Sequence, residues 1–142
     1  MKGRGLVVLQ FLAIGTLVKV AVVNGVSGLG LTLIVFGMII GIWAVVEMRK
    51  SRFRVFPEPH AGAVLLSTGI YSRVRHPMYV AVLFFCLGCI SDIHQWWPVF
   101  IWLGLLVVLV FKIRLEERLL SEKFKEYTEY SKRTKKLIPF IW

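Results

Sequence analysis

Four long apolar stretches dominate the sequence and limit the folds that the chain can adopt. They cover residues 6–23, 28–46, 78–90 and 96–113, and 57% of all residues are hydrophobic. A helix needs about 20 apolar residues to cross a bilayer core that is about 30 Å thick. With short flanks, the first, second and fourth stretches reach that length. The third is shorter, so we expect it either to cross a thinned bilayer or to form half of a re-entrant hairpin.

The continuity of these stretches favours helices over a small barrel. Backbone polar groups in hydrocarbon must be paired within the protein, and barrel strands would alternate polar and apolar residues, which these runs do not. We therefore predict an all-α fold, a polytopic membrane helix bundle with about four transmembrane helices. In residues 114–136, leucine and aromatic residues recur near helical spacing among charged ones, which predicts a cytosolic amphipathic C-terminal helix.

We expect a single domain, residues 1–142, with two parts of different character. Residues 1–46 hold two N-terminal spans, and residues 47–142 hold a polar connection, a helical hairpin and the C-terminal helix. In the first part, Gly37 and Gly41 form a GxxxG pattern, which allows helices to approach closely. We expect this pattern to serve packing inside the bundle rather than homodimerisation.

The basic residues are distributed unequally between the two ends of the predicted spans. With four crossings, all Lys and Arg residues except Lys19 fall on one side, and the connections 24–27 and 91–95 contain none. The positive-inside rule assigns that side, and both termini, to the cytoplasm. We expect an integral protein of the bacterial inner membrane or the endoplasmic reticulum, with membrane lipids as partners. The formal net charge of +10 does not indicate a nucleic-acid partner, because long apolar runs separate the basic residues.

Two charged clusters lie where the chain re-enters the membrane on the basic side. In the first, Arg75 and His76 precede Pro77, which suits the first position of a helix. A helix N-terminus and a planar guanidinium both favour an anion. The second cluster contains Glu116 and Glu117. Together the two clusters would suit a zwitterion such as an amino-acid head group, although a lipid-contacting basic patch and a solvated, ion-paired helix start are the simpler alternatives.

Cysteine and histidine usage does not suggest a metal or redox site. Cys86 and Cys89 lie inside the third apolar stretch, where a free cysteine behaves as a small hydrophobic packing residue. His60, His76 and His94 are isolated from one another and form no zinc-type pattern. We predict no metal ligand in this chain.

An ordered set of motifs covers the second part of the chain. It comprises the run LSTGIYSRVRHPMY at 66–79, the paired glutamates at 116–117, and a tail with FKEYTEY at 124–130 and KLIPF at 136–140. In this order and spacing the chain resembles the isoprenylcysteine carboxyl methyltransferase family, which is grouped with phospholipid N-methyltransferases. It departs from the family at Ala81 and Lys125, where glycine is usual, and in having only two spans before the motifs.

The resemblance implies a site and an activity. It implies that S-adenosylmethionine binds on the cytosolic side, with Arg75, His76, Tyr79, Glu116 and Glu117 around it. Arg75 and Glu116 are the expected catalytic residues, and Tyr71 and Arg73 are weaker candidates.

We expect an integral membrane methyltransferase that moves a methyl group to a lipidic or prenylated acceptor from the bilayer, most simply a prenylcysteine-type carboxylate. The alternatives are methylation of a phospholipid amine, or a non-catalytic four-helix transporter or scaffold. Transport would favour more ionisable residues inside the spans than Lys19 alone.

Overall fold

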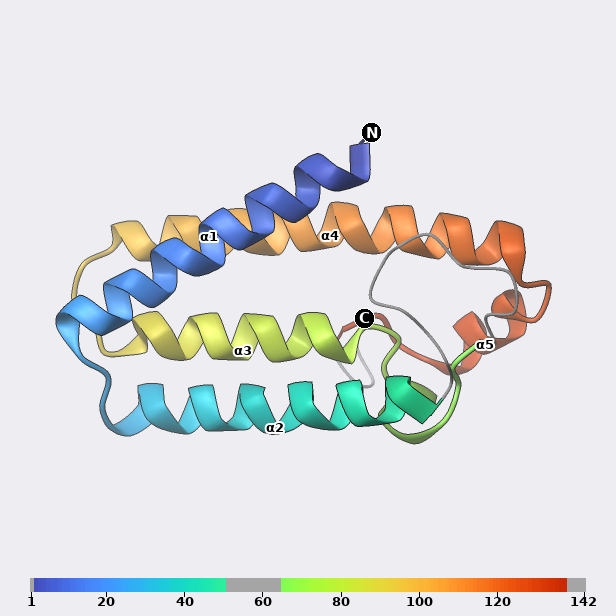
Figure 1. The fold of residues 1–142 in the computed structure, drawn as a ribbon, viewed down its shortest axis with the longest axis horizontal. Helices are drawn as coiled ribbons and strands as arrows, with labels where there is room; N and C mark the ends of the chain where they lie inside the picture. The colour runs from blue at the N-terminus through green and yellow to red at the C-terminus, as the bar shows by residue number, and fades with distance from the viewer. Residues whose placement is uncertain (1, 51–64, 138–142) are drawn as a thin grey trace.

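The computed structural model describes residues 2–50 and 65–137, which form a helical bundle without strands in these two ranges (Figure 1). The elements are α1 (Lys2–Asn24), α2 (Gly28–Lys50), the short 3₁₀ helix η1 (Gly69–Ser72), α3 (Pro77–Ser91), α4 (Trp97–Lys123) and α5 (Tyr127–Arg133). The predicted all-α bundle is confirmed. Residues 51–64 of the polar connection, including His60, and the tail residues 138–142 lie outside the described ranges.

Three of the helices match the predicted membrane spans. α1, α2 and α4 are long and apolar enough to cross a membrane, whereas α3 has 15 residues. The outer surfaces of the long helices expose large apolar side chains, such as Phe11, Ile42 and Phe111. Such surfaces are suited to lipid, and the three helices fit an integral membrane protein.

The structure divides residues 114–136 differently from the prediction. No Gly or Pro occurs between Gly104 and Pro139, so nothing ends the fourth helix at the membrane surface. α4 therefore continues to Lys123 and ends where Phe124 becomes extended, with φ −113° and ψ 111°. Only Tyr127–Arg133 forms a separate C-terminal helix, α5.

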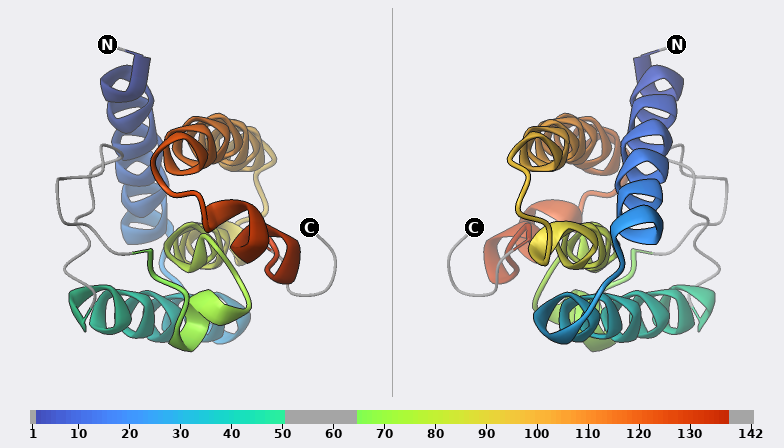
Figure 2. Two further views of the ribbon diagram at one scale, coloured as in Figure 1. Left: turned by 90° about the vertical axis from the view of Figure 1, so that its right-hand side faces the viewer. Right: turned by 90° about the vertical axis from the view of Figure 1, so that its left-hand side faces the viewer.

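α3 is the central helix of the bundle. It packs along α2 and also contacts α1 and α4, while α1 packs mainly on α4 (Figures 1 and 2). The buried core includes Leu17, Cys86, Leu105, Leu109 and Ile113, none of which is exposed. Cys86 and Cys89 are free, buried thiols in this core, as expected for packing residues.

Glycines bring α2 and α3 close together. A Cβ atom on Gly37 would lie 2.7 Å from the backbone nitrogen of Phe85 and 2.8 Å from the carbonyl oxygen of Ala81. On the other helix, a Cβ on Gly88 would lie 2.6 Å from the carbonyl oxygen of Gly30. Small residues at these positions let the two backbones approach, so the glycine pattern serves packing inside the bundle.

Replacing Gly37 should therefore separate α2 from α3. We expect Gly37→Leu to lower the free energy of unfolding in detergent by about 1–3 kcal/mol or more, because backbone atoms cannot move aside as a side chain can. Gly15→Leu is the matched control, since a Cβ at Gly15 meets no atom within 4 Å. Equal stability of the two variants in a denaturant titration would contradict this packing.

Candidate functional site

Backbone pairing fixes the segment before α3 against the chain that follows α5. The Arg75 amide donates to the carbonyl of Lys135 at 2.7 Å, and the His76 amide donates to that of Lys136 at 3.1 Å. In return, the Lys135 amide donates to the carbonyl of Arg73 at 3.0 Å. These bonds hold Arg75, His76 and Lys136 in fixed positions beside α4.

η1 packs against the end of α2. The Thr68 hydroxyl donates to Oε1 of Glu47 at 2.7 Å. Gly69 adopts a φ of +56°, and a Cβ atom there would lie 2.5 Å from Cδ of Glu47, so only glycine fits. The Tyr130 hydroxyl of α5 donates to the carbonyl of Tyr71 at 2.7 Å. These contacts hold η1 in place, and the Tyr71 hydroxyl donates to Sδ of Met48 at 3.9 Å.

The guanidinium group of Arg75 donates hydrogen bonds to acceptors within the protein. Its Nε donates to Oε1 of Glu117 at 2.8 Å, and its Nη1 donates to the carbonyl oxygens of Ser131 and Thr134 at 2.6 and 2.7 Å. Only 8% of the side chain is exposed. Arg75 therefore ties α4 to the last turn of α5 and to Thr134, the residue after it.

Glu117 is the centre of a network of charges. Besides Arg75, its carboxylate lies 3.1 Å from Nζ of Lys136 and 3.6 Å from Nε2 of His76. We call Arg75, His76, Glu116, Glu117 and Lys136 the ion cluster. Both predicted clusters thus meet at one end of the bundle, where α3 begins and α4 approaches its end (Figure 1).

Three members of the ion cluster, Glu116, His76 and Arg75, line a cavity. Oε2 of Glu116 lies 3.5 Å from Nδ1 of His76, and Oε1 of Glu116 accepts a short hydrogen bond from the Tyr79 hydroxyl. The rings of His76 and Tyr79 are stacked, with their centroids 5.5 Å apart and an interplanar angle of 9°. Nε2 of His76 is buried without a hydrogen-bond partner among the described residues.

The environment sets the charge of two groups near the cavity. Burial by itself lowers the pKa of His76, but the carboxylates of Glu116 and Glu117 outweigh it and raise the pKa above the ordinary 6.5. Burial and then the charges of Glu116 and Glu47 raise the pKa of Tyr71 to about 12, so its phenol remains neutral.

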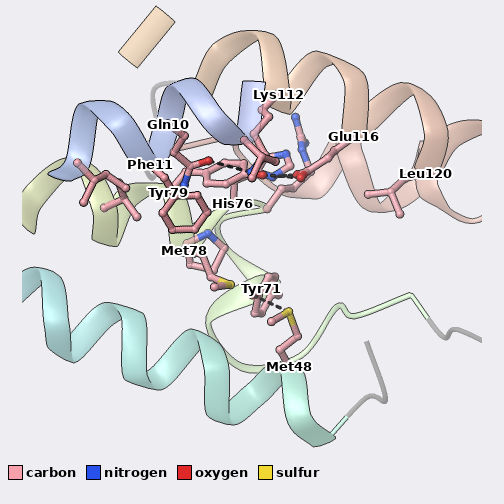
Figure 3. A pocket seen from close by; sticks show the side chains of 15 residues that line it. Gln10, Phe11, Met48, Tyr71, His76, Met78, Tyr79, Lys112, Glu116 and Leu120 are labelled. Carbon is pink, nitrogen blue, oxygen red and sulfur yellow. Dashed lines mark hydrogen bonds and ion pairs between the residues drawn. The ribbon is translucent and has the colours of Figure 1, made fainter. Parts of the chain in front are cut away.

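The cavity has a volume of about 500 Å³ and lies between α1, α3, α4 and the end of α2 (Figure 3). Its walls are largely apolar, with Phe11, Met48 and Met78 among them, and Glu116 and His76 face it at one end. A smaller space of about 50 Å³ adjoins it and shares Tyr71, Arg75, His76 and Leu120 with it. Mostly apolar cavities with a few convergent polar groups are the usual form of a small-molecule site.

All five predicted site residues therefore lie together. Tyr71, a weaker candidate, lines both spaces, whereas Arg73 is exposed and borders a different cavity with Phe36 and Trp43. Within the described ranges, no three His, Cys, Asp or Glu side chains are grouped to hold a metal ion.

Lys112 and Gln10, which were not among the predicted site residues, also line the cavity. Lys112 precedes Glu116 by four residues, a spacing that places both on one face of a helix. Gln10 is a polar interruption of the first apolar stretch. Both features are visible in the sequence, but only the packing of α1 on α4 shows that Gln10 and Lys112 are neighbours.

Fold and site define a class: a small helical membrane protein with a buried acid–base cluster beside a mostly apolar cavity. A family model described as phospholipid methyltransferase matches residues 26–127, most of the chain and all five predicted site residues. The chain therefore belongs to the phospholipid methyltransferase family, and this membership indicates a membrane methyltransferase that acts on lipid-type substrates. A search of curated proteins found no match.

The raised pKa of His76 predicts a pH-dependent contribution to stability. A histidine whose pKa is higher in the folded state stabilises fully below its unfolded pKa of about 6.5. That contribution disappears as the pH rises through the pKa of His76 in the folded state.

We expect the melting temperature of the wild type to exceed that of His76→Gln most at about pH 6, and the difference to shrink towards about pH 9. His94→Gln, in the exposed α3–α4 connection, controls for loss of a histidine. A difference that stays constant or grows with pH would contradict the assignment.

Proposed function

We propose that this protein transfers a methyl group from S-adenosylmethionine to a lipidic acceptor, and that the ion cluster with Tyr79 forms the methyl-donor site. The observation that carries the proposal is the pair His76 and Glu116, which places an imidazole and a carboxylate together at the wall of a cavity of about 500 Å³. Family membership supplies the class of reaction, and this pair supplies groups suited to the donor.

The charges of the site suit an amino-acid head group. Glu116 faces the cavity and, unlike Glu117, forms no ion pair with Arg or Lys among the described residues. We therefore assign Glu116 to the α-ammonium group of the donor. We assign His76 to the carboxylate of the donor, because its ring lines the cavity and the carboxylates of Glu116 and Glu117 favour its protonated, cationic form.

We assign Arg75 and Glu117 to positioning. Arg75 was expected to be a catalytic residue, but its guanidinium already donates to Glu117, Ser131 and Thr134. Through these bonds Arg75 would fix the place of His76 relative to α4. Tyr79, by donating to Glu116, would fix the rotamer of that carboxylate.

Methyl transfer requires mainly that the protein position the donor and the acceptor. S-adenosylmethionine supplies a methyl group on a sulfonium, and the acceptor's lone pair forms the new bond to carbon while the electron pair of the C–S bond stays on sulfur. The chain's residues would orient the acceptor and exclude water from the apolar cavity. A carboxylate acceptor needs no general base, whereas an ammonium acceptor first has to lose a proton.

We favour a prenylcysteine-type carboxylate as acceptor, on the resemblance of residues 66–79 and of the tail. A phospholipid amine is the alternative, because the matched family is described by phospholipids. The walls of the cavity suit the hydrocarbon part of either acceptor, which would enter from the bilayer. We also propose that the end with the ion cluster faces the cytoplasm of a bacterial cell, or the cytosolic side of the endoplasmic reticulum, because basic residues gather there.

Donor binding tests the site directly. Calorimetry should detect binding of S-adenosylhomocysteine to the purified wild type, and Glu116→Gln and His76→Ala should each weaken it about tenfold or more, since each loses a charge-assisted hydrogen bond. Glu122→Gln is the matched control, because Glu122 is exposed on the same helix and pairs only with Arg118 among the described residues. No binding by the wild type to either S-adenosylmethionine or S-adenosylhomocysteine would remove the proposed activity. Unchanged affinity in both variants would remove this site while keeping the class.

The acceptor is identified by the stability of the methylated product. With a labelled methyl donor and a prenylcysteine lipid or phosphatidylethanolamine, a carboxyl methyl ester releases its label as methanol in base, whereas an N-methyl group keeps it. Base-labile label on the prenylcysteine supports our assignment. Base-stable label on the phospholipid supports the alternative.

A further inference from the structure

A lysine projects into the cavity at membrane depth. Nζ of Lys112 donates to Oε1 of Gln10 at 2.9 Å and lies 5.0 Å from the centroid of the Tyr79 ring (Figure 3). Lys112 is half-buried on α4, and Gln10 is a buried polar residue of the otherwise apolar α1. The ammonium group is thus held inward, rather than extended towards the lipid head groups.

The protein does not neutralise this lysine by direct contact. Among the described residues, no carboxylate lies within 4.0 Å of Nζ of Lys112, and its contacts are a neutral amide and an aromatic ring. Placing a charge within a membrane span is costly, and such residues usually face a partner or a ligand. A cation whose direct contacts are neutral, at the wall of a largely apolar cavity, is suited to receive an anion.

The position of Lys112 separates this anion from the donor groups. Lys112 lies four residues before Glu116 on α4, so it sits about 6 Å deeper along the helix axis on the same face. Both residues line the same cavity, as Figure 3 shows. Glu116 would repel an anion at its own level, whereas Lys112 offers a place for one nearer the hydrocarbon.

We propose that Lys112, held by Gln10 and Tyr79, binds the anionic group of the acceptor lipid. This inference rests on the proposed function and assigns the acceptor subsite of the same cavity. The ligand is an oxyanion on a long hydrocarbon chain, either the carboxylate of a prenylcysteine or the phosphate of a phospholipid. Ion pairing to Lys112 would orient the acceptor while its chain lies against Phe11 and Met78.

Steady-state kinetics of Lys112 variants test the proposal with both oxyanion sources, a prenylcysteine lipid and phosphatidylethanolamine. For the source that the wild type methylates, Lys112→Met should raise KM about tenfold or more, because a charge-assisted contact is lost. Lys112→Arg keeps the positive charge, so its KM should lie close to that of the wild type. Calorimetric affinity for S-adenosylhomocysteine should stay within about twofold in both variants, which separates loss of acceptor binding from loss of the fold or of the donor site.

A substitution at Gln10 separates binding from a structural role. Gln10→Glu places a carboxylate against Lys112, so it should strengthen the contact between α1 and α4 while occupying the cation. If Lys112 binds the acceptor, Gln10→Glu raises KM despite an unchanged or higher melting temperature. If Lys112 only joins α1 to α4, Gln10→Glu leaves KM unchanged, and that result would overturn the proposal.

Equilibrium binding supplies a readout that does not depend on turnover. The wild type should bind a prenylcysteine acid or phosphatidylethanolamine more tightly than an uncharged counterpart, the methyl ester or a diacylglycerol. Lys112→Met should abolish that preference. Equal binding of the lipids with and without an oxyanion by the wild type, or binding of neither oxyanion-bearing lipid while S-adenosylhomocysteine still binds, would reject the subsite without rejecting the methyltransferase.

Discussion

The ion pairs of Glu117 are the interaction on which the rest of the site depends. A single carboxylate on α4 receives Arg75 and lies beside His76, both from the segment before α3, and it binds Lys136 from beyond α5. Three parts of the chain that are distant in sequence are thereby fixed around one group. A half-buried carboxylate needs such partners, because an unpaired charge in a low-dielectric surrounding is destabilising. The same partners position His76 and leave Glu116 to face the cavity.

The short third helix makes room for this cluster. α4 has 27 residues and α3 has 15, which correspond to lengths of about 40 Å and about 23 Å. Figure 1 shows that α4 extends well beyond the N-terminal end of α3. The polar segment 73–76 therefore lies against the side of α4. The close packing of α2 on α3 through Gly37 and Gly88 holds the short helix in the centre of the bundle. A third span of full length would leave no space for Arg75 and His76 beside Glu116 and Glu117.

Much of the fold and of the candidate site could be predicted from hydropathy and from the order of the motifs. Continuous apolar runs predicted the helices closely, because backbone pairing in hydrocarbon leaves few alternatives, and Pro77 begins α3 as expected. Motif order predicted that His76, Tyr79, Glu116 and Glu117 come together. The extent of α4 beyond residue 113 was not predicted, since amphipathic character alone does not say whether a helix continues or starts again.

Other features depend on tertiary contacts that local sequence does not encode. The sequence suggested that Arg75 was available for a ligand, but its acceptors come from residues 131–134, which reach it only through the pairing of Lys135 with the segment before α3. Likewise, Gln10 and Lys112 are 102 residues apart, and only the packing of α1 on α4 brings them into contact.

Photo-cross-linking of the methyl donor tests the central claim most directly. Purified protein is irradiated with S-adenosylmethionine that carries a labelled methyl group, and the labelled peptides are mapped. The account predicts label in peptides that contain residues 71–79 or 116–130, and loss of that label with excess S-adenosylhomocysteine. Competable label confined to the opposite end of the bundle, around residues 24–30 or 91–97, would contradict it.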